Sequence, residues 1–405
     1  MTDAPKVELH VHMEGAFDGP HLYEMARRHV DVLPEAVDVS GKPVPLRQAV
    51  LDCADAATFL ERHVHLPQTT CTLADFLAPF NWIMEIVHTA IRVEGLAALE
   101  EFALHFVKRQ HASHVVYTEA RYCPHLFLYA SQFVATANDD EARYKLVRDV
   151  VLAMTRGFRR GEAQYGVTVR TILCCVDFAP QWSDEIARLL LDVGKASGCV
   201  AIDVAAGEGH FASPPEANAC LKAVSAARAA GFGSTIHAGE DPSSSGIAAN
   251  VRTAVEAYGA TRIGHGYATL TDDSVLGLTQ KRGIHFECCP TSSYLTGGFG
   301  PRPRPWSDHP LRTFHERGMS CGLNSDDPLV CGVCLSDDYQ LCVREIGLDA
   351  RAMRTLTENA IDAAFCAAEE KAALRLLVAR YYDEGANVPA AFCREVPVLC
   401  LGRSK

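Results

Sequence analysis

The sequence has 405 residues, of which 48% are hydrophobic and 22% charged, and its formal net charge is -12. This length allows a large buried core, and the acidic balance argues against nucleic acid or an anionic membrane as a partner, because phosphate groups are bound by clustered Lys and Arg side chains. The first residues include charged side chains where a signal peptide needs an apolar segment, and no later stretch offers about 20 apolar residues, so we expect a cytoplasmic protein without a membrane span.

The first predicted element is a strand at residues 7–12, with the sequence Val-Glu-Leu-His-Val-His. The alternation of a strand sends Leu9 and Val11 to one side and His10 and His12 to the other. Two imidazoles on one side can hold a metal ion only if other residues complete its coordination. An isolated His-x-His is more often a pair of ordinary polar residues, so the remaining ligands must come from elsewhere in the chain.

Helical spacing follows at residues 18–28, 57–66 and 73–88, whereas residues 32–55, which contain three prolines, are expected to be irregular. The helix at 73–88 carries Leu73, Phe76, Leu77 and Phe80 at positions i, i+3, i+4 and i+7. An apolar stripe of this kind is more often part of a core than a binding wall.

Predicted strands and helices then alternate. The further strand candidates are residues 115–122, 169–176, 200–204, 234–237, 262–264, 284–288 and 320–324, and helical stretches lie at 93–110, 141–160, 184–197, 216–230 and 251–258. Eight strands separated by helices predict an α/β fold, a (β/α)8 TIM-type barrel, with extra helices in the N- and C-terminal regions. We expect one domain over residues 1–405, with the barrel at about 6–345, peripheral helices at about 350–384 and a tail at 385–405.

Polar motifs stand where the predicted strands end, which is where barrels of this kind place their active sites. The first strand ends in His10 and His12, the fifth in His-Ala-Gly-Glu at 237–240, the sixth in Gly-His-Gly at 264–266 and the eighth in Asn-Ser-Asp-Asp at 324–327. Three histidines and a carboxylate at the strand ends of one barrel form a divalent-metal site with an open position for water. Their joint occurrence favours a metalloenzyme over coincidence.

These segments, in this order, resemble the adenosine deaminase family, in the amidohydrolase class of metal-dependent barrels. The resemblance runs from about residue 6 to about residue 364 and includes Thr-Leu-Ala-Asp-Phe-Leu at 72–77, Val-Val-Tyr-Thr-Glu-Ala-Arg-Tyr at 115–122 and Ala-Ile-Asp at 201–203. It implies one zinc ion per chain, held by His10, His12, His237 and Asp326.

The resemblance also implies roles around the zinc ion. Glu240 would protonate N1 of an aminopurine, His265 would position the attacking water, and Asp327 would hydrogen-bond N7. The predicted catalytic residues are therefore Glu240, His265 and Asp326. The helix at 73–88 matches an apolar lid over the ligand, and the predicted substrate contacts are His12, Glu14, Ala206, Gly207, Asp327 and the lid residues Leu73, Phe76, Leu77 and Phe80.

Two residues depart from the family pattern. Glu14 stands where the family usually has Asp, at the position that contacts the ribose 5'-hydroxyl, and adenine deaminases also often carry Glu there. Ala206 falls on the glycine whose backbone N–H meets N3 of the purine. Ala keeps that N–H, so the contact survives if the backbone conformation suits a side chain; otherwise Gly207 takes the role through a shift of one residue.

The expected activity is zinc-dependent hydrolytic deamination of adenosine and 2'-deoxyadenosine in purine metabolism, with a small purine nucleoside as the binding partner and no indication of a protein partner. Deamination of adenine or another aminopurine is the alternative. A catalytically inactive barrel with a binding role is a hypothesis of another class, but all the predicted ligands and the acid are present, which favours an enzyme.

The pair Cys331-x-x-Cys334 has two competing interpretations. His12-Met-Glu14 and Cys331-x-x-Cys334 are a superficial match to the zinc deaminases that act on cytidine, but the two halves lie at opposite ends of this chain. The interpretation of Cys331 and Cys334 as a redox pair is equally weak, because no βαβ unit surrounds them. The sixteen cysteines lie mainly in apolar runs, so we expect them to be reduced and buried.

Overall fold

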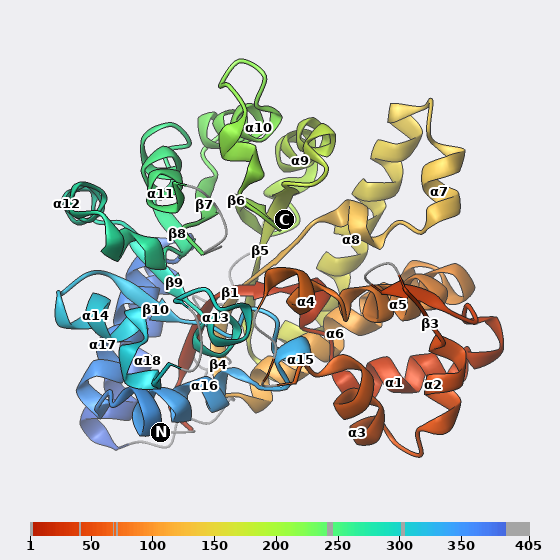
Figure 1. The fold of residues 1–405 in the computed structure, drawn as a ribbon, viewed down its shortest axis with the longest axis horizontal. Coiled ribbons are helices and arrows are strands. Elements are labelled where there is room, and N and C mark those ends of the chain that lie inside the picture. Colours follow the sequence, from red (N-terminus) through yellow and green to blue (C-terminus); the bar gives the residue numbers. More distant parts are fainter. Residues whose placement is uncertain are drawn as a thin grey trace.

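Eight parallel strands form the centre of the fold in a computed structural model that describes residues 3–39, 42–67, 69, 72–240, 246–300 and 304–385. The strands are joined in the order β1-β4-β5-β6-β7-β8-β9-β10, and helices lie around them (Figure 1). Their bounds are β1 Lys6–His12, β4 Val115–Tyr122, β5 Thr168–Val176, β6 Cys199–Ala205, β7 Gly233–Ala238, β8 Arg262–His265, β9 His285–Cys288 and β10 Cys321–Leu323. The predicted barrel is thereby confirmed.

The ring of strands closes between β1 and the residues that follow β10. The backbone N–H of His12 donates to the carbonyl oxygen of Asp326 at 2.9 Å, and the N–H of Asp326 donates to the carbonyl oxygen of His10 at 3.1 Å. The seam between the first and last strands therefore runs through three residues that the sequence predicts as metal ligands.

Mostly apolar runs form several of these strands because both faces of a parallel barrel strand are buried. In β5, Ile172 to Val176 are all buried, with cysteines filling two positions as small hydrophobic side chains. All thirteen described cysteines are free, as expected for reduced thiols.

Helices connect the strands and pack outside them. The main ones are α6 Leu96–Ala112, α8 Asp140–Tyr165, α9 Ser183–Leu189, α10 Ala219–Ala229, α11 Ile247–Glu256, α12 Asp273–Arg282 and α14 Pro310–Glu316. Their ends follow local chemistry: the side chain of Asp139 caps the start of α8 by accepting from the N–H of Ala142, and Gly166 ends it with a φ of 74°. Short helices follow several strands, namely α7 Ala130–Ala135, α13 Pro290–Thr296 and α15 Pro328–Cys331.

Extra helices occur in the N- and C-terminal regions, as predicted. The N-terminal group is α1 Gly19–Arg28, α2 Leu46–Asp52, α3 Ala56–Phe59, α4 Leu73–Leu77 and α5 Phe80–Glu94, and the C-terminal group is α16 Leu335–Leu341, α17 Ala350–Ala363 and α18 Ala368–Glu384. No described helix is both long enough and apolar enough to cross a membrane. Apart from Gly385, the predicted tail lies outside the described residues.

Two predictions in the N-terminal region were wrong. The single helix expected at residues 73–88 is two helices, α4 and α5, separated at Ala78 and Pro79, because proline has no N–H to continue the hydrogen bonding of α4. The region 32–55, expected to be irregular, contains a small hairpin, β2 Val37–Val39 and β3 Lys42–Val44, followed by α2. Strands of three residues that pair only with each other leave little periodic signal in a sequence.

Candidate metal and catalytic site

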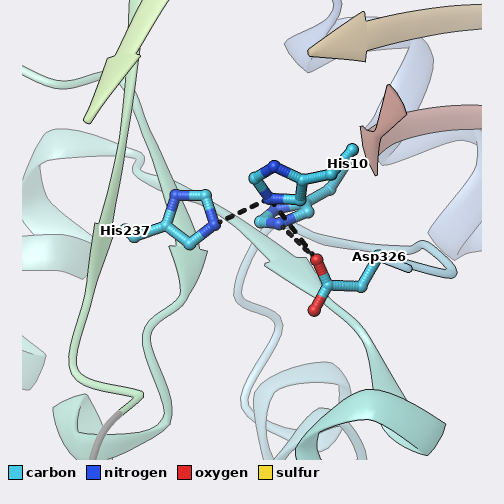
Figure 2. A group of neighbouring side chains, drawn as sticks. His10, His237 and Asp326 are labelled. Carbon is cyan, nitrogen blue, oxygen red and sulfur yellow. Dashed lines mark hydrogen bonds and ion pairs between the residues drawn. The ribbon is translucent and has the colours of Figure 1, made fainter. Parts of the chain in front are cut away.

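His10, His12, His237 and Asp326 meet at the C-terminal ends of the barrel strands. One ligand atom from each lies within 4.8 Å of all the others. His10 Nε2 is 3.1 Å and His12 Nε2 is 3.5 Å from Asp326 Oδ1, and His12 Nε2 is 3.2 Å from His237 Nε2. Figure 2 shows His10, His237 and Asp326 turned toward one another. The structure thus brings together the four residues that the sequence predicts as ligands, and they form a metal site.

Two carboxylates fix the tautomers of His10 and His237 in this group. Glu287 Oε2 lies 2.7 Å from His10 Nδ1, and Asp203 Oδ2 lies 3.0 Å from His237 Nδ1. Because an ionised carboxylate only accepts hydrogen bonds, each Nδ1 carries the proton and each Nε2 turns a lone pair inward. His10 Nε2 is buried and makes no hydrogen bond to any described residue. Inward lone pairs beside a carboxylate repel one another unless a cation lies among them, so these residues fit a divalent metal.

Arg121 links the two carboxylates behind the histidines. Its guanidinium donates to Asp203 Oδ2 at 2.8 Å and to Glu287 Oε2 at 2.7 Å, and all three side chains are fully buried. Burial alone raises the pKa of Glu287, but Arg121 and Arg262 outweigh it and hold this pKa well below its usual range. Both carboxylates can therefore remain ionised and hold the imidazoles in place.

No role was predicted from the sequence for Arg121, Asp203 or Glu287. Their signal is a charged residue inside an otherwise apolar barrel strand, which is costly to bury unless it is paired. The partners come from different strands, however, and strand pairing cannot be read from one segment alone.

His265 and Glu240 lie next to the metal group. His265 Nε2 is 3.2 Å from Glu240 Oε2 and 3.9 Å from Asp326 Oδ2. Burial lowers the pKa of His265 well below its usual range, so this imidazole is neutral and can accept a proton. Burial raises the pKa of Asp326, but its close contact with His10 outweighs burial and holds this pKa well below the usual range, so Asp326 is ionised.

Backbone strain concentrates at this site. The described residues other than glycine with positive φ are His114, Ala206, His265 and Asp326, and the last three line one cavity. Their φ values of 67°, 60° and 64° lie in the left-handed region, which costs about 1–2 kcal/mol for a residue with a Cβ. Such strain is typical of functional sites, where it aims side chains or N–H groups that a regular strand would not.

Glu208 holds the backbone of the predicted acid. Its two carboxylate oxygens accept from the N–H groups of Gly239 at 3.0 Å and Glu240 at 2.9 Å, and Asn250 Nδ2 donates to the same carboxylate at 2.6 Å. Glu208 was not predicted from the sequence, although its position just after β6 follows the rule that places functional groups at strand ends.

A cavity of about 400 Å³ opens above these groups. All the predicted lid residues line it, as do the other predicted substrate contacts; the full set is Leu73, Phe76, Leu77, Phe80, His12, Glu14, Ala206, Gly207 and Asp327. No Lys or Arg is found among the described residues that line the cavity. Phe76 is only 2% exposed and packs with Leu295 and Cys331 in a small cluster apart from the main core.

Two carboxyl groups in the cavity wall have an oxygen without a protein partner. Glu14 Oε1 accepts from the N–H of Cys123 at 2.9 Å, while Glu14 Oε2 and Asp327 Oδ1 are buried and make no hydrogen bond to the described chain. Burial raises the pKa of Glu14 to about 7. Burial, together with Asp326, Glu14 and Glu240, raises the pKa of Asp327 well above its usual range. Buried polar atoms left open in a cavity indicate that a ligand completes them.

The structure also describes the other residues for which the sequence left alternatives open. Ala206 takes the left-handed conformation despite its Cβ, and Gly207 next to it has a φ of 138°. Which of their N–H groups meets a ligand stays a prediction. Cys331 packs with Phe76, and neither Cys331 nor Cys334 joins a potential metal-ligand group within the described part of the chain.

Comparisons with known proteins match nearly the whole chain. A family model described as adenosine deaminase matches residues 5–381. The chain is 32% identical to adenosine deaminase from Bos taurus over 393 residues, which is 96% of this chain and 97% of the relative. It is 27% identical to adenosine deaminase from Clostridium perfringens, covering 93% of this chain and 99% of the relative.

Solved structures share the fold. An amidohydrolase from Burkholderia ambifaria with bound Zn has a TM-score of 0.71 at 24% identity, covering 96% of this chain and 93% of that chain. Adenine deaminase from Arthrobacter aurescens has a TM-score of 0.67 at 20% identity, covering 93% of this chain and 99% of that chain. N6-methyl-AMP deaminase from Arabidopsis thaliana has a TM-score of 0.70 at 20% identity, covering 95% of this chain and 98% of that chain. By its sequence over nearly its whole length, the chain belongs to the adenosine deaminase family.

Proposed function

We propose that this protein is a zinc-dependent deaminase that converts adenosine and 2'-deoxyadenosine to inosine and deoxyinosine with release of ammonia. The observation that carries the proposal is the position of the metal group: His10, His12, His237 and Asp326 lie at one cavity, next to Glu240 and His265 and below an apolar wall. Family membership supports the reaction class, and the relatives named adenosine deaminase support the nucleoside.

The donor set supports zinc as the metal. Three imidazole nitrogens and one carboxylate oxygen suit a catalytic zinc site, and the related amidohydrolase structure contains bound Zn. When bound, zinc would lower the pKa of a water molecule from about 15.7 to about 7, which makes a nucleophile available at neutral pH.

The chain's own residues can move the protons of the reaction. As the water oxygen bonds to C6, neutral His265 accepts a proton from it, and Glu240 donates a proton to N1, where the electron pair of the ring C=N bond arrives. His265 then gives its proton to the amine, and the C6–N6 bond breaks as the C6 hydroxyl passes its proton to Glu240 and becomes the carbonyl, so ammonia leaves and both side chains return to their starting state. Asp327, kept protonated by burial and the carboxylates around it, can donate to N7 of the purine.

Glu14 and the charge of the cavity bear on the choice of substrate. The open Oε2 of Glu14 can pair with a ribose 5'-hydroxyl in either protonation state, since a carboxylate accepts and a carboxylic acid can also donate. A phosphate at that position would meet acidic groups and no Lys or Arg from the described lining. Adenine is the second candidate substrate, because Glu at this position also occurs in adenine deaminases.

Ammonia release from adenosine, 2'-deoxyadenosine, adenine and AMP, measured side by side, tests the proposal. We expect both nucleosides to be good substrates, with kcat/KM within the usual range of roughly 10⁴ to 10⁸ M⁻¹s⁻¹, adenine to be poor and AMP to be poorer still. A preference for adenine or AMP would overturn the nucleoside assignment. No ammonia from any aminopurine would contradict the deaminase itself.

A further inference from the structure

The loop after β6 carries backbone groups that the proposed function needs. Ala206 and Gly207 line the cavity, and one of their N–H groups is predicted to meet N3 of the purine. Glu208, the next residue, accepts hydrogen bonds from the N–H groups of Gly239 and Glu240 and so holds the backbone of the predicted acid. The loop is not a relaxed turn, because Ala206 has a φ of 67° and Gly207 a φ of 138°. Contacts outside the loop must therefore hold it in this conformation.

Asp177, directly after β5, makes such contacts from behind the loop. Its carboxylate accepts hydrogen bonds from the N–H groups of Gly209, at 3.2 Å, and His210, and it lies 3.2 Å from His210 Nδ1. The N–H of Asp177 donates to the carbonyl oxygen of Ala205 at 2.9 Å. Burial raises the pKa of this carboxyl, but the hydrogen bonds with His210 and Gly209 outweigh burial and lower the pKa below its usual value, so Asp177 is ionised. One residue thus ties both ends of the loop to the end of β5.

The two glycines of the loop leave room for this carboxylate. A Cβ on Gly207 would lie 2.8 Å from Asp177 Oδ2, and a Cβ on Gly209 would lie 3.0 Å from the same oxygen. Both distances are shorter than an ordinary van der Waals contact, so a side chain at either position would push the carboxylate away. The Gly-Glu-Gly sequence at 207–209 therefore fits an aspartate at position 177.

Asn218 supports the far end of the loop independently of Asp177. Its Nδ2 donates to the carbonyl oxygen of His210 at 2.8 Å, and its Oδ1 accepts a hydrogen bond from the N–H of Leu221 in the first turn of α10. Asn218 and His210 are both buried. Loss of the Asp177 carboxylate would therefore release the part of the loop at the cavity and leave the part after His210 in place.

We propose that Asp177 is a positioning residue for the purine and for the acid. It holds the loop at 206–210 so that a backbone N–H faces N3 and the carboxylate of Glu208 faces the N–H of Glu240. This role rests on the proposed function, because a purine must occupy the cavity for the loop to meet it. Asp177 is not among the described residues that line the cavity, so it acts through the loop and does not touch the substrate. Without its carboxylate, Ala206 can leave the strained left-handed conformation and turn the N–H groups of the loop away from N3.

Two nucleoside analogues test the N3 contact without turnover. 1-Deazaadenosine keeps N3 but has no N1 to accept a proton, and 1,3-dideazaadenosine has neither nitrogen, so the ratio of their Kd values measures the contribution of N3. Both Kd values are measured by calorimetry on the zinc-loaded enzyme. We expect the wild type to bind 1-deazaadenosine about five- to tenfold more tightly, which is the usual effect of one hydrogen bond. In Asp177→Asn this ratio should fall to about one, because asparagine has one acceptor oxygen in place of two.

Three further variants serve as a second test and as controls. Gly209→Ala places a Cβ against the Asp177 carboxylate without removing its charge, so the ratio of Kd values should also fall. Gly277→Ala, where a Cβ would meet no atom within 4 Å, should keep the wild-type ratio. Asp272→Asn makes the same chemical change at the start of α12, where the side chain accepts two backbone N–H groups, and it should also keep the wild-type ratio.

The effect on the acid gives a second measurement. Because Asp177→Asn loosens the segment that carries Glu208, kcat for adenosine should fall about tenfold or more. Adding Asp177→Asn to Glu240→Gln should cost little further activity, since that variant has no acid to position. A full additional loss in the double variant would show that Asp177 does not act through Glu240.

Other results would overturn the role at N3. Equal losses of affinity for both analogues in Asp177→Asn would make Asp177 a general support of the fold. A wild-type ratio of about one would mean that no group meets N3, and a ratio that stays at the wild-type value in both Asp177→Asn and Gly209→Ala would remove Asp177 from its control. Failure of the proposed function is distinct: it would appear as no ammonia from adenosine, whereas the two Kd values require no reaction.

Discussion

Buried carboxyl groups near the cavity differ in charge because their neighbours differ. Asp326 and Glu287 are held ionised against the effect of burial by imidazoles and by arginines, respectively. Asp327 and Glu14 have burial as the dominant influence, and their pKa values are raised. The first pair can thus hold metal ligands as anions, whereas the second pair can meet a ligand as hydrogen-bond donors or acceptors.

The first residue-scale prediction concerns the acid. Glu240→Gln keeps the shape of the side chain and its backbone contacts with Glu208 but cannot donate a proton to N1. We expect kcat for adenosine to fall by about 10² or more, in the range usual for a general acid, with normal zinc content. Glu162→Gln is the control for the same chemical change away from the site, because the side chain of Glu162 accepts the N–H of Val169 at the other end of the barrel. An unchanged kcat in the Glu240 variant would place the acid elsewhere.

The second residue-scale prediction concerns the sugar. Glu14→Ala removes the oxygen that we assign to the ribose 5'-hydroxyl and leaves that hydroxyl unpaired. We expect a loss of about 1–3 kcal/mol in kcat/KM for adenosine and little change for 5'-deoxyadenosine. The measurement is the ratio of kcat/KM for these two substrates in variant and wild type. Equal losses on both would show that Glu14 supports the zinc site and does not contact the sugar.

Among the elements, the strands were easier to predict than the helices. Barrel strands are buried on both faces, so several of them are short runs of mostly apolar residues, and β4 was predicted at 115–122 with the bounds that the structure gives. The prediction of one helix at 73–88 was wrong because the apolar spacing continues across Pro79, whereas the missing N–H of that proline interrupts the helix.

Some residues of the candidate site could be predicted from the sequence and others could not. The strand-end rule and the family resemblance located His10, His12, His237 and Asp326 because each stands in a short motif of its own segment. Glu208 and Arg121 were missed as functional residues because their roles exist only through contacts with other segments, at Glu240 and Glu287. One sequence shows the residue but not its distant partner.

The element-scale prediction concerns α4 as a lid. Phe76 lines the cavity yet packs only in a small cluster with Leu295 and Cys331. Phe76→Ala should therefore raise KM for adenosine while costing less stability than the roughly 3–5 kcal/mol of a core Phe→Ala change. Kinetics and thermal unfolding of the same variant measure both effects.

Phe102 in α6 provides the comparison, because it is fully buried in the main core and does not line the cavity. Phe102→Ala should lower the melting temperature strongly and leave KM unchanged. A Phe76 variant that loses stability as Phe102→Ala does, with KM untouched, would make α4 part of the core and not a lid.

At the scale of the whole molecule, the metal site lies on the seam that closes the barrel. Asp326 exchanges backbone hydrogen bonds with His10 and His12, while its side chain joins theirs in the metal group. His237 enters from β7, farther around the ring. The ligands therefore come together only when the first and last strands meet, so assembly of the site depends on complete folding of the barrel. That residues 1–405 form one domain stays a prediction.

The dependence of activity on zinc shows most directly whether His10, His12, His237 and Asp326 hold a catalytic metal. The metal is removed by exhaustive chelation, zinc is added back in steps, and ammonia release from adenosine is measured at each ratio of zinc to chain. Because His10, His12, His237 and Asp326 complete one coordination sphere, we expect nearly all activity to be lost and then restored in proportion to zinc, up to about one ion per chain. The His237→Ala variant should recover almost no activity when zinc is added. Protein that remains fully active after exhaustive chelation would show that the reaction does not need this metal site.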